Sequence, residues 1–146
     1  MLVDWGLARD IRAVSIKPKG FVSGTPLTMS QRSLAFLMKE QPATCTADIL
    51  KQSRVDLGAA YTYTIADELE SAAKSVLLIL SPALKRTIRH QISNKAKGIS
   101  SAAVLWECWH DVLSKDLREL CQSHSYSGIA DWLTSNDRLL LYQPRA

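Results

Sequence analysis

Residues 100–123 read SSAAVLWECWHDVLSKDLRELCQS, and this stretch decides which fold the chain adopts. Apolar side chains recur in it at steps of three and four residues, at Leu105, Trp109, Val112, Leu113, Leu117, Leu120 and Cys121. Such spacing gathers them into one stripe along an α-helix, and Ser100 can cap the first turn. The stretch therefore predicts an amphipathic helix over residues 100–123 that packs against a second helix.

Residues 56–80 are predicted to form that second helix. Asp56 can act as its N-cap, and apolar or small residues follow at helical steps, namely Leu57, Tyr61, Ile65, Leu69, Ala72, Val76 and Leu80. Shorter helices are expected from Thr28 to the residues before Pro42, at residues 46–53, from Ser127 onward and at residues 136–142. Together these patterns predict an all-α fold, a compact bundle of five or six helices.

The length and composition indicate one globular domain. A chain of 146 residues with 47% hydrophobic and 22% charged residues can bury one core. Turn-forming residues at Pro18, Gly20, Gly24 and Pro26 predict an irregular N-terminal arm over residues 1–27, followed by the helical domain at residues 28–146.

Several features suggest a cytoplasmic protein. No apolar stretch approaches the roughly 20 residues that span a bilayer, and the charged residues among the first twelve do not fit a secretion signal. The odd number of cysteines, 3, favours reduced thiols over a disulfide framework.

The segment between the two long helices carries the main functional signal. Ser81 and Pro82 are typical of a helix start, and residues 82–97 contain no acidic residue but six basic side chains, Lys85, Arg86, Arg89, His90, Lys95 and Lys97. At about 100° per residue, Leu84, Ile88 and Ile92 share one side of this helix, whereas most of the basic residues share the other. Guanidinium and ammonium groups without intervening carboxylates suit phosphate contacts.

These residues predict a non-enzymatic nucleic-acid-binding or regulatory protein that contacts the phosphate backbone through the basic helix. The same side chains are also compatible with a solvated face, or with ion pairs to the acids of residues 107–119. A further alternative is a small helical adaptor or inhibitor of phage, plasmid or viral origin that binds an acidic protein surface. Trp106, beside the apolar stripe, is a candidate for self-association into a homo-oligomer.

Residues 28–70 resemble, in outline, the helix-turn-helix of winged-helix repressors of the penicillinase-repressor type. The resemblance implies a recognition helix that begins within Ala60-Tyr-Thr-Tyr-Thr-Ile-Ala. Asp67, Glu68 and Glu70 would lie on that helix, where acids repel DNA.

Two short motifs suggest further chemistry. Cys108, His110, Cys121 and His124 are zinc-ligand types, but on one continuous helix they are too far apart for a single ion. Arg118 and His124 resemble the Arg-x4-6-His motif of HEPN ribonucleases, which implies an acid or base at His124 and charge stabilisation by Arg118. Because phosphate-binding glycine loops and nucleophile elbows are also missing from the sequence, we expect no metal, no cofactor and no enzyme activity.

Overall fold

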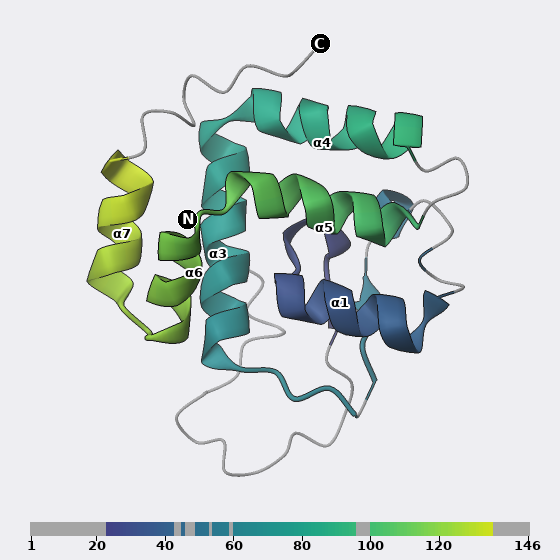
Figure 1. Ribbon diagram of the computed structural model, residues 1–146, viewed down its shortest axis with the longest axis horizontal. Coiled ribbons are helices and arrows are strands. Elements are labelled where there is room, and N and C mark those ends of the chain that lie inside the picture. The colour runs from purple at the N-terminus through teal and green to yellow at the C-terminus, as the bar shows by residue number, and fades with distance from the viewer. Residues whose placement is uncertain are drawn as a thin grey trace.

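The computed structural model describes residues 23–42, 45, 49–52, 54–58, 60–95 and 100–135 (Figure 1). Six α-helices lie in these ranges: α1 (Gln31–Glu40), α3 (Ile65–Leu80), α4 (Pro82–Lys95), α5 (Ser101–Val112), α6 (Lys115–Gln122) and α7 (Tyr126–Ser135). Two 3-10 turns, Pro26–Thr28 and Ile49–Lys51, and two antiparallel strands, β1 (Ser23–Gly24) and β2 (Val55–Asp56), complete the described elements. The predicted all-α bundle is confirmed. None of the helices in these ranges has the length and apolar character that crossing a membrane requires.

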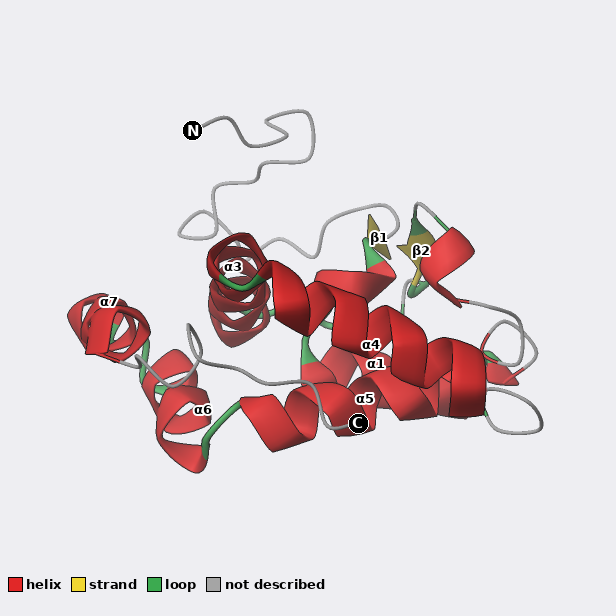
Figure 2. Ribbon diagram, turned by 90° about the horizontal axis from the view of Figure 1, so that it is seen from above, coloured by secondary structure: helices red, strands yellow, loops and turns green. Residues whose placement is uncertain are grey.

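The helices form two groups that meet at α3. In Figure 1, α4, α5 and α1 lie one below another across the view, with α5 in contact with both neighbours, and α3 runs across them. Helices α6 and α7 lie on the far side of α3. Figure 2 shows the same molecule from above, where α4 is the outermost helix of its group.

Helix α3 is shorter than the predicted helix over residues 56–80, because it begins at Ile65. Thr64 caps its first turn, with its hydroxyl accepting from the Asp67 amide and the Asp67 carboxylate accepting from the Thr64 amide. Upstream, Val55 and Asp56 pair with β1, and Gly58 adopts a φ of 80°, which interrupts any helix there. Leu57 and Tyr61 are buried as expected, but from extended chain.

The buried side of α3 also differs from the predicted stripe. Ala72 and Leu80 are exposed and Val76 is only partly buried. The helix instead buries Asp67, Ala73, Lys74 and Leu77. Two of these residues are charged, so an apolar pattern alone selects the wrong register.

The predicted helix over residues 100–123 is divided into α5 and α6. The division lies at Leu113 and Ser114, where Ser114 caps α6 by accepting from the Leu117 amide at 3.2 Å. The same hydroxyl accepts from the indole nitrogen of Trp132 on α7 at 3.0 Å. The apolar residues Trp109, Leu113, Leu117 and Cys121 remain buried through the break, so the predicted core stripe holds although the helix bends.

The N-cap of helix α1 is Ser30, two residues after the predicted cap at Thr28. Thr28 instead ends the 3-10 turn that precedes the helix. This turn belongs to the fold, since the indole nitrogen of Trp109 donates to the Leu27 carbonyl at 2.8 Å. The spacing of Leu34, Leu37 and Met38 predicts that all three point inward, and the structure buries Leu34 and Leu37 fully and Met38 partly.

The remaining expected elements either differ in the structure or lie outside the residues that it describes. The short helix predicted at residues 46–53 is represented by the 3-10 turn Ile49–Lys51, with its ends outside the described residues. Helix α7 begins at Tyr126 with the Ser125 hydroxyl accepting from the Gly128 amide, not at Ser127. The turn predicted at residues 136–142 and most of the arm, residues 1–22, lie outside the described ranges.

Candidate nucleic-acid interface

The basic helix α4 is held by one apolar face. It starts at Pro82, as predicted, and the preceding Ser81 is buried with its hydroxyl accepting from the Leu84 amide at 3.4 Å. Leu84, Ile88 and Ile92 are at most 2% exposed and attach the helix to the bundle, where it contacts α3 and α5. The orientation of α4 is therefore fixed by burial.

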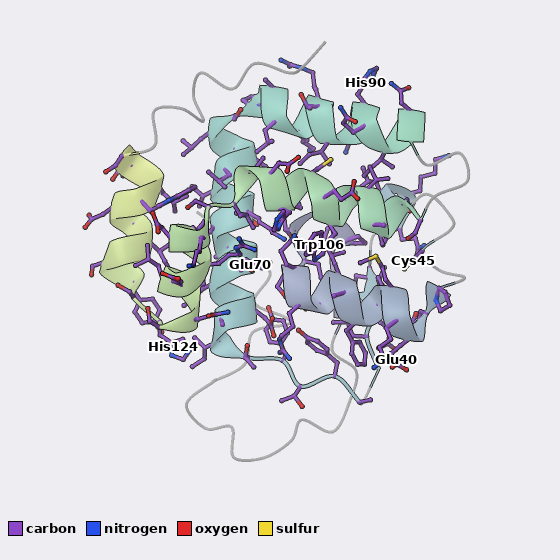
Figure 3. All side chains as sticks on the ribbon, viewed as in Figure 1. Glu40, Cys45, Glu70, His90, Trp106 and His124 are labelled. Atoms are coloured by element: carbon purple, nitrogen blue, oxygen red, sulfur yellow. The ribbon has the colours of Figure 1, made fainter. Side chains whose placement is uncertain are left out.

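The opposite face of α4 is basic and exposed. Lys85, Arg86, Arg89 and His90 are all exposed, and Figure 3 shows His90 pointing away from the rest of the molecule. Two further predicted site residues are not placed: the Lys95 side chain and all of Lys97 lie outside the description. The sequence prediction is thus confirmed for the exposure of four basic side chains.

Lys85, Arg86 and Arg89 carry charges that no acid in the described part of the chain neutralises. Glu107 and Asp111, the acids proposed as alternative partners, are exposed on α5. The ion pairs between described residues are Arg32 with Asp67, Lys74 with Glu70, and Lys115 with Glu119, and none of them involves α4. Pairing with the acids of residues 107–119 is therefore not found among the described side chains.

His90 has one polar neighbour on its own helix. The amide nitrogen of Asn94 lies 2.9 Å from Nε2 of His90, one turn away. The donor and acceptor roles in this contact depend on the tautomer of the His90 ring. The side chain is exposed, so a ring nitrogen of His90 can reach a ligand.

Other ionisable residues are used inside the fold. Asp67 is 3% exposed and accepts hydrogen bonds from Ser30, Arg32, Tyr61 and Thr64. Burial raises the pKa of this carboxyl, but the hydrogen bonds from Arg32, Ser30, Thr64 and Tyr61 outweigh burial and hold the pKa below its usual value. Arg32 also lies 4.6 Å from the ring centre of Tyr61.

Lys74 is the buried charge that the sequence analysis missed. Its Nζ donates to the Met29 carbonyl at 2.6 Å and to Oε1 of Gln31 at 2.9 Å, and it lies 5.2 Å from the Trp109 ring centre. Burial lowers the pKa of Lys74 to about 8, although Glu70 opposes the shift. The sequence contains one signal for this burial: Asp67 and Lys74 are seven residues apart and therefore share one face of the helix.

The zinc motif does not assemble in the described ranges, and the ribonuclease resemblance of Arg118 and His124 stays untested. No three metal-binding side chains come together there. Arg118 lies by His110, with Nη1 3.4 Å from Nδ1. His124 is exposed in the turn after α6 at a φ of 56°, a conformation that serves as a helix C-cap.

The winged-helix resemblance is not supported by the arrangement of α3. Residues 61–64 are not helical, and α3 is the helix that joins the two groups of the bundle. Asp67 and Glu70 are engaged by α1, through Arg32 and the Gln31 amide. The side of α3 that carries Asp67 and Glu70 therefore packs against α1 and cannot enter a DNA groove.

Trp106 is only partly buried and packs against the core. Its ring stacks on His110 at 4.8 Å with an angle of 11°, and its carbonyl accepts from Gln31 at 2.8 Å. The self-association predicted for Trp106 stays a prediction.

Comparison with known proteins gives no similar protein: no family model, no curated protein and no solved structure matches the chain.

Proposed function

We propose that the protein binds nucleic acid through the exposed face of α4, with Lys85, Arg86, Arg89 and His90 contacting phosphate oxygens. The observation that carries the proposal is the segregation of charge on this helix. Its most buried residues, Leu84, Ile88 and Ile92, are apolar, and its exposed face holds four basic side chains without an acid in residues 82–95.

The physical basis is the release of condensed counterions. Each phosphate that a basic side chain neutralises frees cations from the nucleic acid, which favours binding at low salt. The α4 cations form no ion pair with described residues, so no internal salt bridge must break before they reach a phosphate. An acidic protein surface, the alternative from the sequence, would meet the same charges but would lack a dense counterion layer.

A salt titration tests the proposal. Fluorescence anisotropy measures binding to labelled duplex and single-stranded oligonucleotides. The logarithm of the association constant should fall linearly with the logarithm of the salt concentration. The double variant Arg86→Glu with Arg89→Glu should reduce binding at low salt at least about tenfold and flatten the salt slope by about two.

The matched control is Lys39→Glu with Lys115→Glu, which reverses two exposed lysines on α1 and α6. Each substitution of a basic residue by Glu lowers the net charge by two, so both double variants bring the formal net charge from +4 to zero. Equal losses in the two variants would mean that only total charge matters. That result, the absence of binding at low salt, or equally tight binding of polyglutamate would overturn the proposal.

A further inference from the structure

We infer that the ligand of α4 is double-stranded DNA and that the helix lies in its major groove. The inference rests on the proposed function and adds the type of nucleic acid and the role of each basic residue. It follows from the position of α4 in the fold and from the order of side chains around its axis.

The outer half of α4 is exposed among the residues that the structure describes. The helix packs through Leu84, Ile88 and Ile92, and Figures 1 and 2 show it at the edge of its group, with α5 on one side. Its 14 residues extend over about 21 Å at about 1.5 Å per residue. A helix about 10–12 Å wide fits the B-DNA major groove, which is about 12 Å wide.

The side chains are ordered around the axis in a way that separates base contacts from phosphate contacts. At about 100° per residue, Arg86 and Ser93 lie near the middle of the exposed face, with Arg89 and His90 on either side of them. Lys85 lies on the flank beyond Arg89, and Asn94 lies on the flank beyond His90. Residues in the middle of a helix that enters a groove meet the base edges, whereas those on the flanks meet the two phosphate backbones.

This order assigns distinct roles to the basic residues. The planar guanidinium groups of Arg86 and Arg89 can each donate two hydrogen bonds to O6 and N7 of a guanine, the commonest specific contact in the major groove. Lys85 and the amide nitrogen of Asn94, on the two flanks, then bind phosphates on opposite sides of the groove. The exposed Glu107 and Asp111 of α5 disfavour phosphate on their side, so the duplex approaches from the outer side of α4.

Other nucleic acids fit α4 less well. The major groove of A-form RNA is deep and narrow, so that a protein helix does not enter it. Single strands are bound by stacking bases on aromatic rings, and residues 82–95 contain no aromatic side chain except His90, which is engaged by Asn94. Double-stranded DNA is therefore the ligand that the face fits best.

The test compares four probes with the full chain: a DNA duplex containing G·C pairs, the RNA duplex and the DNA single strand of the same sequence, and the DNA duplex with 7-deazaguanine. The last probe lacks N7 in the major groove but keeps its charge. We expect the unmodified DNA duplex to bind at least about tenfold more tightly than each of the other three. The Arg86→Lys with Arg89→Lys variant keeps the charge but loses the two-pronged donor, so it should bind both DNA duplexes equally with an unchanged salt slope.

Equal affinity for duplex DNA, duplex RNA and single strands would overturn the inference while leaving the proposed function intact, provided that the charge reversals of α4 still abolish binding. Unchanged discrimination against 7-deazaguanine in the Arg→Lys variant would also overturn the roles of Arg86 and Arg89. A Lys85→Arg variant is the matched control, because a flanking residue that binds phosphate should leave the discrimination unchanged.

Discussion

Nζ of Lys74 lies 3.2 Å from Oε2 of Glu70, one turn earlier on α3, and the lysine side chain is completely buried. Glu70 in turn accepts from the Gln31 amide of α1, and the Gln31 side chain donates to the Trp106 carbonyl of α5. A buried ion pair therefore joins three helices, α1, α3 and α5, through hydrogen bonds.

Lys74→Met should lower the free energy of unfolding by about 3–5 kcal/mol, because it leaves the Glu70 carboxylate without its cation and the Met29 carbonyl and the Gln31 amide oxygen without their donor. Urea denaturation measures the loss. In a double-mutant cycle, Lys74→Met with Glu70→Gln should lose less than the sum of the two single variants. Additive losses would show that the pair is not coupled.

Stability should rise between pH 8 and pH 9. The folded-state pKa of Lys74, lowered by burial, is about 8 against an ordinary value of 10.5, so in this window the unfolded chain holds a proton that the folded protein has released. Unfolding free energy then increases with pH. Above pH 9 Cys121 acts in the opposite direction, since burial raises the pKa of its thiol from 9.0 to about 11.

The measurement for this pH effect is urea denaturation at closely spaced pH values. Lys74→Met should remove the rise between pH 8 and pH 9. A rise of the same size in that variant would assign the effect to another group.

Asp67→Asn should weaken the loss of stability in acid. Burial raises the pKa of Asp67, but hydrogen bonds led by the one from Arg32 hold it below 3.8, so the carboxylate stabilises the fold above its unfolded pKa. This contribution disappears as pH falls through the folded pKa. Comparing acid titrations of stability checks the point, and Glu40→Gln, at an exposed position on α1, serves as the control that should keep the wild-type profile.

Ser114→Ala should cost about 1 kcal/mol or more, because one hydroxyl both caps α6 and accepts from Trp132. Hydrogen exchange should show the amides of α7 opening faster than those of α1. Trp132→Phe keeps most of the ring packing but loses the same hydrogen bond, so it should reproduce the effect on α7. Uniform acceleration over all helices would contradict a local role for Ser114.

His124→Gly should stabilise the protein by about 0.5–1 kcal/mol. His124 adopts a φ of 56° after α6, and glycine reaches this region without the strain of a side chain. Thermal unfolding measures the change, and His124→Val should shift the midpoint in the opposite direction. A stabilised His124→Gly variant that still binds nucleic acid would also separate this residue from the proposed interface.

The sequence predicted features that depend on one helix at a time. The apolar face of α4 and its exposed cations follow from residue spacing. The helix starts, at Ser81 with Pro82 and at Ser100, follow from local chemistry. The exposed basic face of α4 could therefore be predicted from the sequence, and its role in binding stays a prediction, as do the positions of the Lys95 and Lys97 side chains, which lie outside the described residues.

Features that depend on distant partners were not predictable in this way. The apolar pattern of residues 100–123 is continuous and does not indicate the break at Ser114. At this break the Ser114 hydroxyl accepts from the indole nitrogen of Trp132, which lies on another helix. Likewise, the start of α3 depends on the capping box of Thr64 and Asp67, and its buried face on partners that Lys74 finds in α1. A hydropathy pattern places charged residues such as Asp67 and Lys74 on the protein surface, although hydrogen bonds stabilise both in buried positions.

The contact between the Trp109 indole and the Leu27 carbonyl spans 82 residues, and the contact between Gln31 and Trp106 spans 75. Closing such long loops costs chain entropy before any contact compensates it. During synthesis, α1 leaves the ribosome before α5 and gains its contact with the Trp106 carbonyl only after α5 has followed. Contacts between residues so far apart in sequence slow folding relative to local ones.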